Sequence, residues 1–292
     1  MNARSPLAVA PAKTKKLKVV PNEATTQTSH HVDEIEDSNP DFVTAIGRGF
    51  AILRCFKRNA KVLGNKELAE MTGLPKSTVA RLTFTLTKLG YLNFLPAIEK
   101  YELGIGVLTL GQTYLSGLDA REVARPLMQE LANYAGATVT MGAPHGQDMV
   151  FLEICHGNQV FMMRVAVGQR VPHGMTALGR AYIAALTPEQ RAKYSIEYRP
   201  RVKPDEWKRL EEVTDQALRD HEKYGFCFSL GEWNNDVFAV GVPMVSNDGS
   251  KVLAFSCSGP VHEMTRKRII SDIGPRLVQL RDRVQTMLGG VF

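Results

Sequence analysis

The sequence predicts an α+β protein in two parts: a small basic helical domain, then a larger domain built on an antiparallel sheet. The excess of positive charge is concentrated in residues 41–104, which carry ten Lys or Arg against five Asp or Glu. Residues 105–292 are nearly neutral. Helical spacing of apolar residues dominates the first segment, whereas short strand-like runs separated by Gly, Pro and Asn dominate the second.

Length and composition limit the class of protein. With 292 residues, 44% of them hydrophobic, the chain can fill two cores. No apolar run approaches the roughly 18 residues of a membrane span and the N-terminus lacks a signal-peptide layout, so we expect a cytoplasmic protein without a membrane partner. The four cysteines have no CxxC spacing and the histidines from His145 onward form no HxH or HxxxH pair. We therefore expect no metal, no cofactor and no disulfide framework.

Residues 1–40 are rich in Ala, Pro, Lys, Thr, Ser and acids, with few large apolar groups. Such a segment cannot bury enough surface to offset the entropy of ordering, so we expect a disordered tail.

Three helices are expected after this tail. The first begins at Thr44 and ends near Arg58; the second begins at Asn65, a favourable N-cap, and ends at Gly73, which supplies a left-handed turn residue. The third begins at Pro75, whose missing N–H costs nothing at a helix start. The residues expected to face the core are Ile46, Phe50, Leu53 and Phe56, then Leu68, Ala69 and Met71, then Val79, Leu82, Leu86 and Leu89.

The third helix has a polar face without a carboxylate. No Asp or Glu occurs in residues 76–88, and the side away from the apolar stripe combines hydroxyls, cations and one Phe. Such a face suits a groove lined with phosphates and base edges, although an ordinary solvated face is the alternative. Arg81 is the best candidate for a contact to guanine, and Phe84 for one to a thymine methyl. The candidate DNA contacts on this helix are Lys76, Ser77, Thr78, Arg81, Phe84, Thr85 and Lys88.

Two short strands are expected next, over residues 91–94 and 100–103, around a turn at Pro96 and Ala97. A wing is the economical interpretation, and its Lys100 is a further candidate for a phosphate contact. Residues 105–119 then carry a helical apolar repeat, which predicts a helix that links two domains and could pack against a second subunit.

The larger part is expected to hold a helix over residues 120–135 and later helices over 177–186 and 205–224. Between them lie apolar, β-branched runs typical of strands. Helices flanking an antiparallel sheet are the architecture that this order favours. The strand-like runs are "ATVTMGAP", "DMVFLEI", "QVFMMRVAVG", "VFAVGVPMV" and "KVLAFSCSGP".

These features resemble the IclR family of bacterial transcription regulators, from about Phe42 to the C-terminus. The resemblance is carried by "ELAEMTGLPKSTVARLTFTLTKLGYL", "YELG", "GQRVPHGMTALGRA" and "AFSCSGP". It implies a winged helix-turn-helix DNA-binding domain over residues 41–104, a linker helix over 105–119 and a GAF-like effector-binding domain over 120–292. It also implies a homodimer or homotetramer on double-stranded DNA, most simply a palindromic operator.

The residues of the larger part suggest where a ligand binds. Strand alternation places Ser256 and Ser258 on one face and Cys257 on the other, so the two hydroxyls could hold a ligand oxygen or simply bond to neighbouring backbone. The "GMTALGRAY" stretch predicts a helix that begins near Ala177 and Leu178, whose free N–H groups attract anions. We therefore expect a small carboxylate as effector.

The resemblance adds further candidates. In related regulators the acid ligand meets the helix start, here Ala177 and Leu178, and the corresponding pocket walls are Met163 and Val171. His173 lies in the family's Pro-Leu-His-Ala region. Glu232 and Trp233 lie where relatives carry an acidic lid, and the indole suggests an aromatic acid, or else a hydrophobic plug over the sheet.

The expected function is that of a ligand-responsive repressor or activator of a catabolic operon. A DNA-binding scaffold without a ligand is one alternative. A cysteine-dependent enzyme using Cys257, His173 and Glu232 is another, although Cys257 should point into the core, where a thiol is inert.

Overall fold

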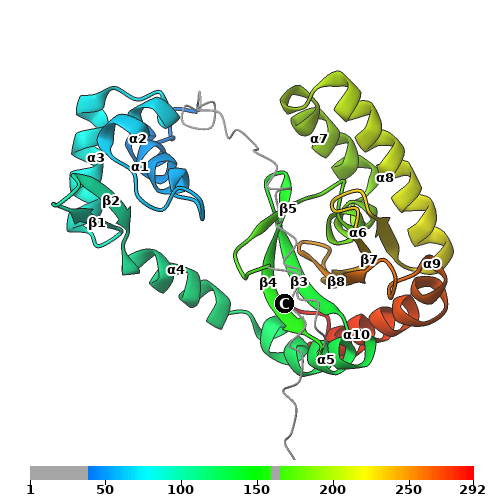
Figure 1. Ribbon diagram of the computed structural model, residues 1–292. Helices are drawn as coiled ribbons and strands as arrows, with labels where there is room; N and C mark the ends of the chain where they lie inside the picture. The colour runs from blue at the N-terminus through cyan, green and yellow to red at the C-terminus, as the bar shows by residue number, and fades with distance from the viewer. Residues whose placement is uncertain (1–38, 159–164) are drawn as a thin grey trace, which may run out of the picture. The chain divides into compact units, whose positions relative to one another are not determined.

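The structure is a computed structural model that describes residues 39–158 and 165–292. The chain divides into two compact units (Figure 1). The boundary in the sequence lies between Val123 and Ala124. The expected tail lies almost wholly outside the described residues, as do Met163 and most of the run "QVFMMRVAVG".

The first unit packs three helices and a β-hairpin around a small core. Gly73 has φ 67 and ends α2 in the left-handed conformation, as expected. The Thr83 hydroxyl donates to Asn65 Oδ1 at 3.1 Å and joins α3 to the start of α2. The elements are α1 (Thr44–Cys55), α2 (Asn65–Thr72), α3 (Lys76–Lys88), β1 (Leu92–Leu95), β2 (Lys100–Leu103) and α4 (Ile105–Ser116). The buried core is Ile52, Cys55, Phe56, Leu63, Leu68, Leu74, Val79 and Leu92.

Several residues expected in this core lie outside it. Ile46 and Phe50 are 59% and 51% exposed, because α1 turns its Ile52 and Cys55 side toward α2 and α3. Met71 is also exposed. Leu89 is exposed because α3 ends at Lys88 and the chain turns away from the helix. Asn65 is the first residue of α2 and not its N-cap, which is Gly64.

The second unit is built on a six-stranded antiparallel sheet in the order β5-β4-β3-β8-β7-β6 (Figure 1). The α+β class and the flanking helices are confirmed. The strands are β3 (Thr138–His145), β4 (Asp148–His156), β5 (Arg170–Pro172), β6 (Cys227–Leu230), β7 (Val237–Val245) and β8 (Val252–Pro260). The helices are α5 (Asp119–Ala135), α6 (Ala177–Ala185), α7 (Pro188–Tyr198), α8 (Pro204–Tyr224), α9 (Arg266–Arg268) and α10 (Gly274–Met287), with short non-α turns η2 (Arg199–Arg201) and η3 (Ile269–Ile273).

Helix α6 covers one face of this sheet at β7 and β8. Its close approach depends on Gly241, since a Cβ there would lie 2.2 Å from the carbonyl oxygen of Ala177. The opposite face carries Cys155 and Cys257, of which the first donates to the Arg125 carbonyl of α5 at 3.7 Å. The alternation predicted for β8 is therefore confirmed, with Ser256 and Cys257 on opposite faces.

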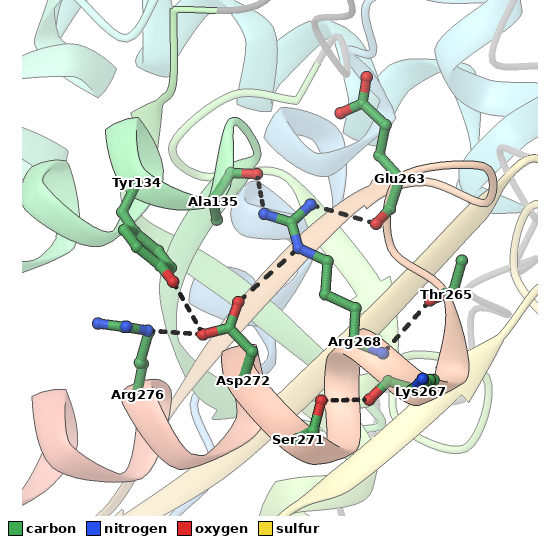
Figure 2. A network of polar contacts seen from close by, with 9 residues as sticks. All are labelled: Tyr134, Ala135, Glu263, Thr265, Lys267, Arg268, Ser271, Asp272 and Arg276. Carbon is green, nitrogen blue, oxygen red and sulfur yellow. Dashed lines mark hydrogen bonds and ion pairs between the residues drawn. The ribbon is translucent and has the colours of Figure 1, made fainter.

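Polar contacts join the end of α5 to the segment after β8 (Figure 2). Arg268 donates to the carbonyl of Ala135 at 3.0 Å, while Asp272 accepts from Tyr134 at 3.0 Å and from Arg276 at 2.7 Å. Asp272 lies in η3, which has π-helical hydrogen bonds. Together these contacts tie the C-terminal helices to the end of α5.

The sequence patterns did not predict β5, β6, α7 or α10. Strands β5 and β6 have three and four residues, too short for a clear alternation. The described end of "QVFMMRVAVG", residues 165–168, is not strand.

Candidate nucleic-acid interface and ligand pocket

Helix α3 presents the predicted polar residues outward. Val79 and Thr83 are buried and orient the helix on the core. On the other side, exposed Lys76, Ser77, Arg81, Phe84, Thr85 and Lys88 form the face that we call the α3 outer face, with Thr78 half-buried at its edge.

The side chains of this face are available to a partner to different degrees. No carboxylate of the described residues pairs with Lys76 or Arg81. Phe84 is 62% exposed, and the Lys88 ammonium lies 5.5 Å from the centre of its ring. The Thr85 hydroxyl already donates to the Arg81 carbonyl at 2.9 Å, which leaves its oxygen to accept. Within the described residues, the face thus offers two cations, Lys76 and Arg81, without a carboxylate partner, and an exposed aromatic ring.

Lys100 differs from these cations. Its ammonium forms an ion pair with Glu67, which also accepts the Gly64 N–H at 2.8 Å and so caps α2. The hydrogen bonds from Lys100 and Gly64 lower the pKa of the Glu67 carboxyl. No local pattern indicates this pairing, since the two residues are 33 positions apart. A phosphate would have to compete with Glu67 for Lys100.

A pocket lies where α6 begins over the sheet. The space between its atoms is about 440 Å³, which includes open solvent, and the cavity itself is about 30 Å³, room for one or two water molecules. We call it the α6 pocket. It is lined by Thr140, Phe151, Val171, Thr176, Ala177, Leu178, Ser229, Trp233, Asn234, Val237, Ala239, Ser256 and Ser258.

The start of α6 lines this pocket with Thr176, Ala177 and Leu178. Thr176 is the N-cap, and its hydroxyl oxygen accepts the Gly179 N–H at 3.1 Å. Among the described residues, none accepts a hydrogen bond from the N–H groups of Ala177 and Leu178. These two N–H groups therefore stand at the positive end of the helix dipole.

Hydroxyl groups from neighbouring strands lie across the pocket. The oxygens of Thr140 and Ser256 are 2.8 Å apart, and Ser258 donates weakly to the Thr138 carbonyl at 3.4 Å. No lining residue carries a formal charge. A ligand carboxylate in this pocket would therefore be held by neutral donors and the helix dipole.

Of the predicted effector contacts, the structure brings together Val171, Ala177, Leu178, Trp233, Ser256 and Ser258. His173 is not among the lining residues: it is fully buried, its Nδ1 lies 3.2 Å from the Tyr194 hydroxyl, and its ring packs in tilted contacts against Tyr182 and Tyr194. Burial lowers the pKa of its imidazole to about 3. Its side chain belongs to an aromatic cluster beside the pocket.

Glu232 also turns away from the lining. Its carboxylate lies 2.9 Å from the buried Arg180 guanidinium and accepts from the Ser229 hydroxyl at 2.9 Å. Burial opposes ionisation, but Arg180 and the hydrogen bonds outweigh it and lower the pKa of the carboxyl. The expectation that Glu232 contacts the effector directly is therefore not supported by the geometry.

Sequence patterns missed several lining residues, notably Thr140, Ser229 and Ala239. The strand register explains their position, because Thr140 pairs with Ser256 and Ala239 pairs with both Ser229 and Ser258. Alternation along each strand was visible in the sequence, but the pairing of the strands was not.

Comparison with known proteins finds family matches in both the N-terminal and the C-terminal part of the chain. A family model described as the IclR helix-turn-helix domain matches residues 45–96. A second, described as bacterial transcriptional regulator IclR C-terminal, matches residues 112–284 and thus more than half of the chain.

The chain belongs to the IclR family.

Relatives along nearly the whole length support this membership. The HTH-type transcriptional regulator TsaQ1/TsaQ2 of Comamonas testosteroni is 35% identical over 255 residues, which are 87% of this chain and 91% of that protein. The crystal structure of an IclR family transcriptional regulator from Brucella abortus is 41% identical with a TM-score of 0.79, covering 88% of this chain and 98% of that one.

One structural relative was solved with a bound small molecule. It is an IclR homologue from Microbacterium hydrocarbonoxydans complexed with 4-hydroxybenzoate, with 20% identity and a TM-score of 0.66, covering 84% of this chain and 99% of that chain. At this identity the likeness shows the fold.

This IclR-family protein is a DNA-binding transcriptional regulator and not an enzyme. Cys257 is fully buried on the face opposite Ser256, and burial raises the pKa of its thiol to about 12. Among the described residues, every helix is too short or too polar to span a bilayer. The same part of the chain holds no group of three His, Cys, Asp or Glu side chains arranged around a metal position.

Proposed function

We propose that this regulator senses a small aromatic carboxylate in the α6 pocket and that the ligand changes its affinity for a palindromic operator. The observation that carries the proposal is that Ala177 and Leu178, whose N–H groups have no acceptor among the described residues, line a pocket without a charged side chain. An anion is attracted there, whereas a cation finds no counter-charge.

The walls of the pocket favour an aromatic acid. Phe151 and Trp233 contribute rings, and Val171 and Leu178 contribute aliphatic surface. The hydroxyls of Ser256 and Thr140 provide a polar position that a ring substituent or a carboxylate oxygen could reach. The relative that binds 4-hydroxybenzoate supports the same class of ligand for this chain.

On the DNA side, we propose that the α3 outer face enters the major groove. Arg81 reads a guanine, assisted by Ser77, Thr78 and Thr85, while Phe84 contacts a thymine methyl and Lys76 and Lys88 contact phosphates. Two such helices on a homodimer or homotetramer would read two half-sites. The exposed apolar residues of α4 support assembly, since α4 buries none of its residues within the chain.

The test is a thermal melt of the full chain with acetate, pyruvate, benzoate, 4-hydroxybenzoate and the neutral 4-hydroxybenzamide. A bound ligand at about 100 times its Kd adds roughly 2.7 kcal/mol to the free energy of unfolding. We expect a rise in melting temperature with the aromatic acids and none with the amide. If no acid shifts the melting temperature, the regulator is a ligand-independent scaffold or senses another class of compound.

A further inference from the structure

Arg180 joins three segments that adjoin residues of the α6 pocket. It lies on the first turn of α6 and is 4% exposed. Its Nε donates to the Gly174 carbonyl at 3.0 Å and its Nη1 donates to the Phe228 carbonyl at 2.7 Å. The remaining nitrogen, Nη2, lies 2.9 Å from Glu232 Oε1. The guanidinium therefore connects the turn before α6, strand β6 and the segment after it.

Glu232 is held from both sides. Its second oxygen accepts the Ser229 hydroxyl at 2.9 Å and the Leu230 N–H at 2.5 Å. Gly231, with φ +100, makes the sharp turn that folds the carboxylate back onto β6. The Glu232 side chain thus points toward Arg180 while the next residue, Trp233, lines the pocket.

The segment after β6, residues 231–236, also has local hydrogen bonds toward its C-terminal end. The Asn234 side-chain oxygen accepts the Asp236 N–H at 3.0 Å, and the Asn234 carbonyl accepts the Val237 N–H at 2.9 Å. Trp233 packs against a cluster that includes Phe151 and Leu178. Within the described residues, Arg180 is the side chain that forms an ion pair with the segment of residues 231–236, through Glu232.

We infer that Arg180 and Glu232 are positioning residues that hold Trp233 over the α6 pocket and so set which carboxylates the pocket accepts. The pair acts through Trp233 and does not contact the ligand. A buried guanidinium requires a counter-charge, so Glu232 remains engaged with Arg180. Because its charge is neutralised there, Glu232 does not repel an anion in the pocket. The ligand part of this inference rests on the proposed function, whereas the placement of Trp233 does not.

The placement can be tested without a ligand. The chain has two tryptophans, and a Trp207→Phe background leaves Trp233 as the fluorophore. We expect Glu232→Gln to raise the acrylamide quenching constant of Trp233 by a factor of about two, because the indole is no longer held in the pocket. The matched control is Glu212→Gln, which neutralises an exposed carboxylate on α8 and should leave quenching unchanged. If Trp207→Phe does not fold, the difference between the parent and Trp233→Phe proteins gives the same signal.

Glu232→Gln leaves Arg180 buried without a counter-charge and can unfold the domain. Glu232→Asp keeps that charge but shortens the side chain by one methylene, so it cannot reach Arg180, Ser229 and the Leu230 N–H together. We expect the same increase in quenching for this variant. Equal quenching in the parent protein and in every folded Glu232 variant would overturn the inference.

The second measurement is selectivity, by calorimetric titration of 4-hydroxybenzoate and acetate. We expect Glu232→Asp to weaken 4-hydroxybenzoate binding about tenfold and to change acetate binding much less, because only the larger acid contacts the indole. An equal loss for both acids would show a merely structural role and overturn the inference. If the parent protein binds neither acid, the proposed ligand class fails, and the quenching result alone decides the placement of Trp233.

Discussion

The hydroxyl oxygens of Thr140 and Ser256 lie 2.8 Å apart on neighbouring strands at the floor of the α6 pocket. When one hydroxyl donates to the other, the second keeps a hydrogen that can point to a ligand oxygen. The pair therefore provides one donor that is already oriented by its neighbour.

Replacing Ser256 by Ala should lower both ligand affinity and stability. It removes the oriented donor and leaves the Thr140 hydroxyl without its partner, at a cost of about 1 kcal/mol to the free energy of unfolding. We expect 4-hydroxybenzoate binding, measured by calorimetric titration, to weaken by about a factor of ten. The matched control is Ser258→Ala, whose hydroxyl makes only a 3.4 Å contact to the Thr138 carbonyl. A larger loss at Ser258 than at Ser256 would contradict the role of the pair.

Replacing Arg81 by Ala should weaken specific DNA binding by about 1–3 kcal/mol and relax the preference at one operator position. The reason is the loss of a free guanidinium at the centre of the α3 outer face. Binding of randomised duplexes followed by sequencing measures the preference. Lys66→Ala is the control, since Lys66 lies on α2 and pairs with Glu70. If the sequence preference of Arg81→Ala is unchanged, Arg81 does not read a base.

Lys100 and Lys76 should differ in how much they contribute to the salt dependence of DNA binding. Each free cation on a phosphate changes the slope of log K against log salt by about one. We expect Lys76→Ala to reduce the slope by about that amount and Lys100→Ala to reduce it much less, because Lys100 is already paired with Glu67. Fluorescence anisotropy over a salt series measures both slopes. Equal slopes for the two variants would mean that DNA separates Lys100 from Glu67.

His173 should make the protein less stable in mild acid. The pKa of the buried imidazole is about 3 in the folded protein, below the ordinary value of 6.5. Between these two values the unfolded chain binds a proton that the folded chain does not, so the free energy of unfolding rises with pH. The contribution of neutral His173 to this free energy is fully present above about pH 6.5. Below that pH it falls by up to about 1.4 kcal/mol per pH unit.

Urea unfolding between pH 5 and pH 6.5 measures this dependence. His173→Phe, which keeps a ring in the aromatic cluster, should flatten the slope. His221 contributes a slope of the same sign, because burial also lowers the pKa of its imidazole. His262→Gln, at an exposed position, is the control. A slope that His173→Phe leaves intact would mean that His173 is protonated in the folded protein.

Leu108→Glu should disrupt the proposed assembly of the regulator through α4. Leu108 is 64% exposed on α4, next to other exposed apolar residues of the same helix. A buried glutamate at a subunit interface carries a large desolvation cost. We expect a lower assembly mass in sedimentation velocity and weaker binding to a two-half-site duplex, with Thr109→Glu as the control. An unchanged mass would place the subunit contact elsewhere.

Much of the proposed DNA interface could be predicted from the sequence. Along α3 the periodicity of 3.6 residues alone separates Val79 from Arg81, and the absence of Asp and Glu is a property of the chain itself. Gly73 likewise predicted the turn before α3. In the α6 pocket, Ser256 and the start of α6 were predicted by the same local rules.

The remaining features depend on residues that are distant in the chain. Glu67 neutralises Lys100 across 33 positions, and Arg180 forms an ion pair with Glu232, although Lys100 and Glu232 were expected to contact ligands. Thr140 and Ser229 enter the pocket because β3 pairs with β8 and β6 pairs with β7. The sequence by itself determined which side of a helix or strand each residue occupies, because that depends only on local backbone geometry. Tertiary structure alone decided which charges are neutralised and which strands pair. Both depend on residues far apart in the sequence, which come into contact only when the chain folds.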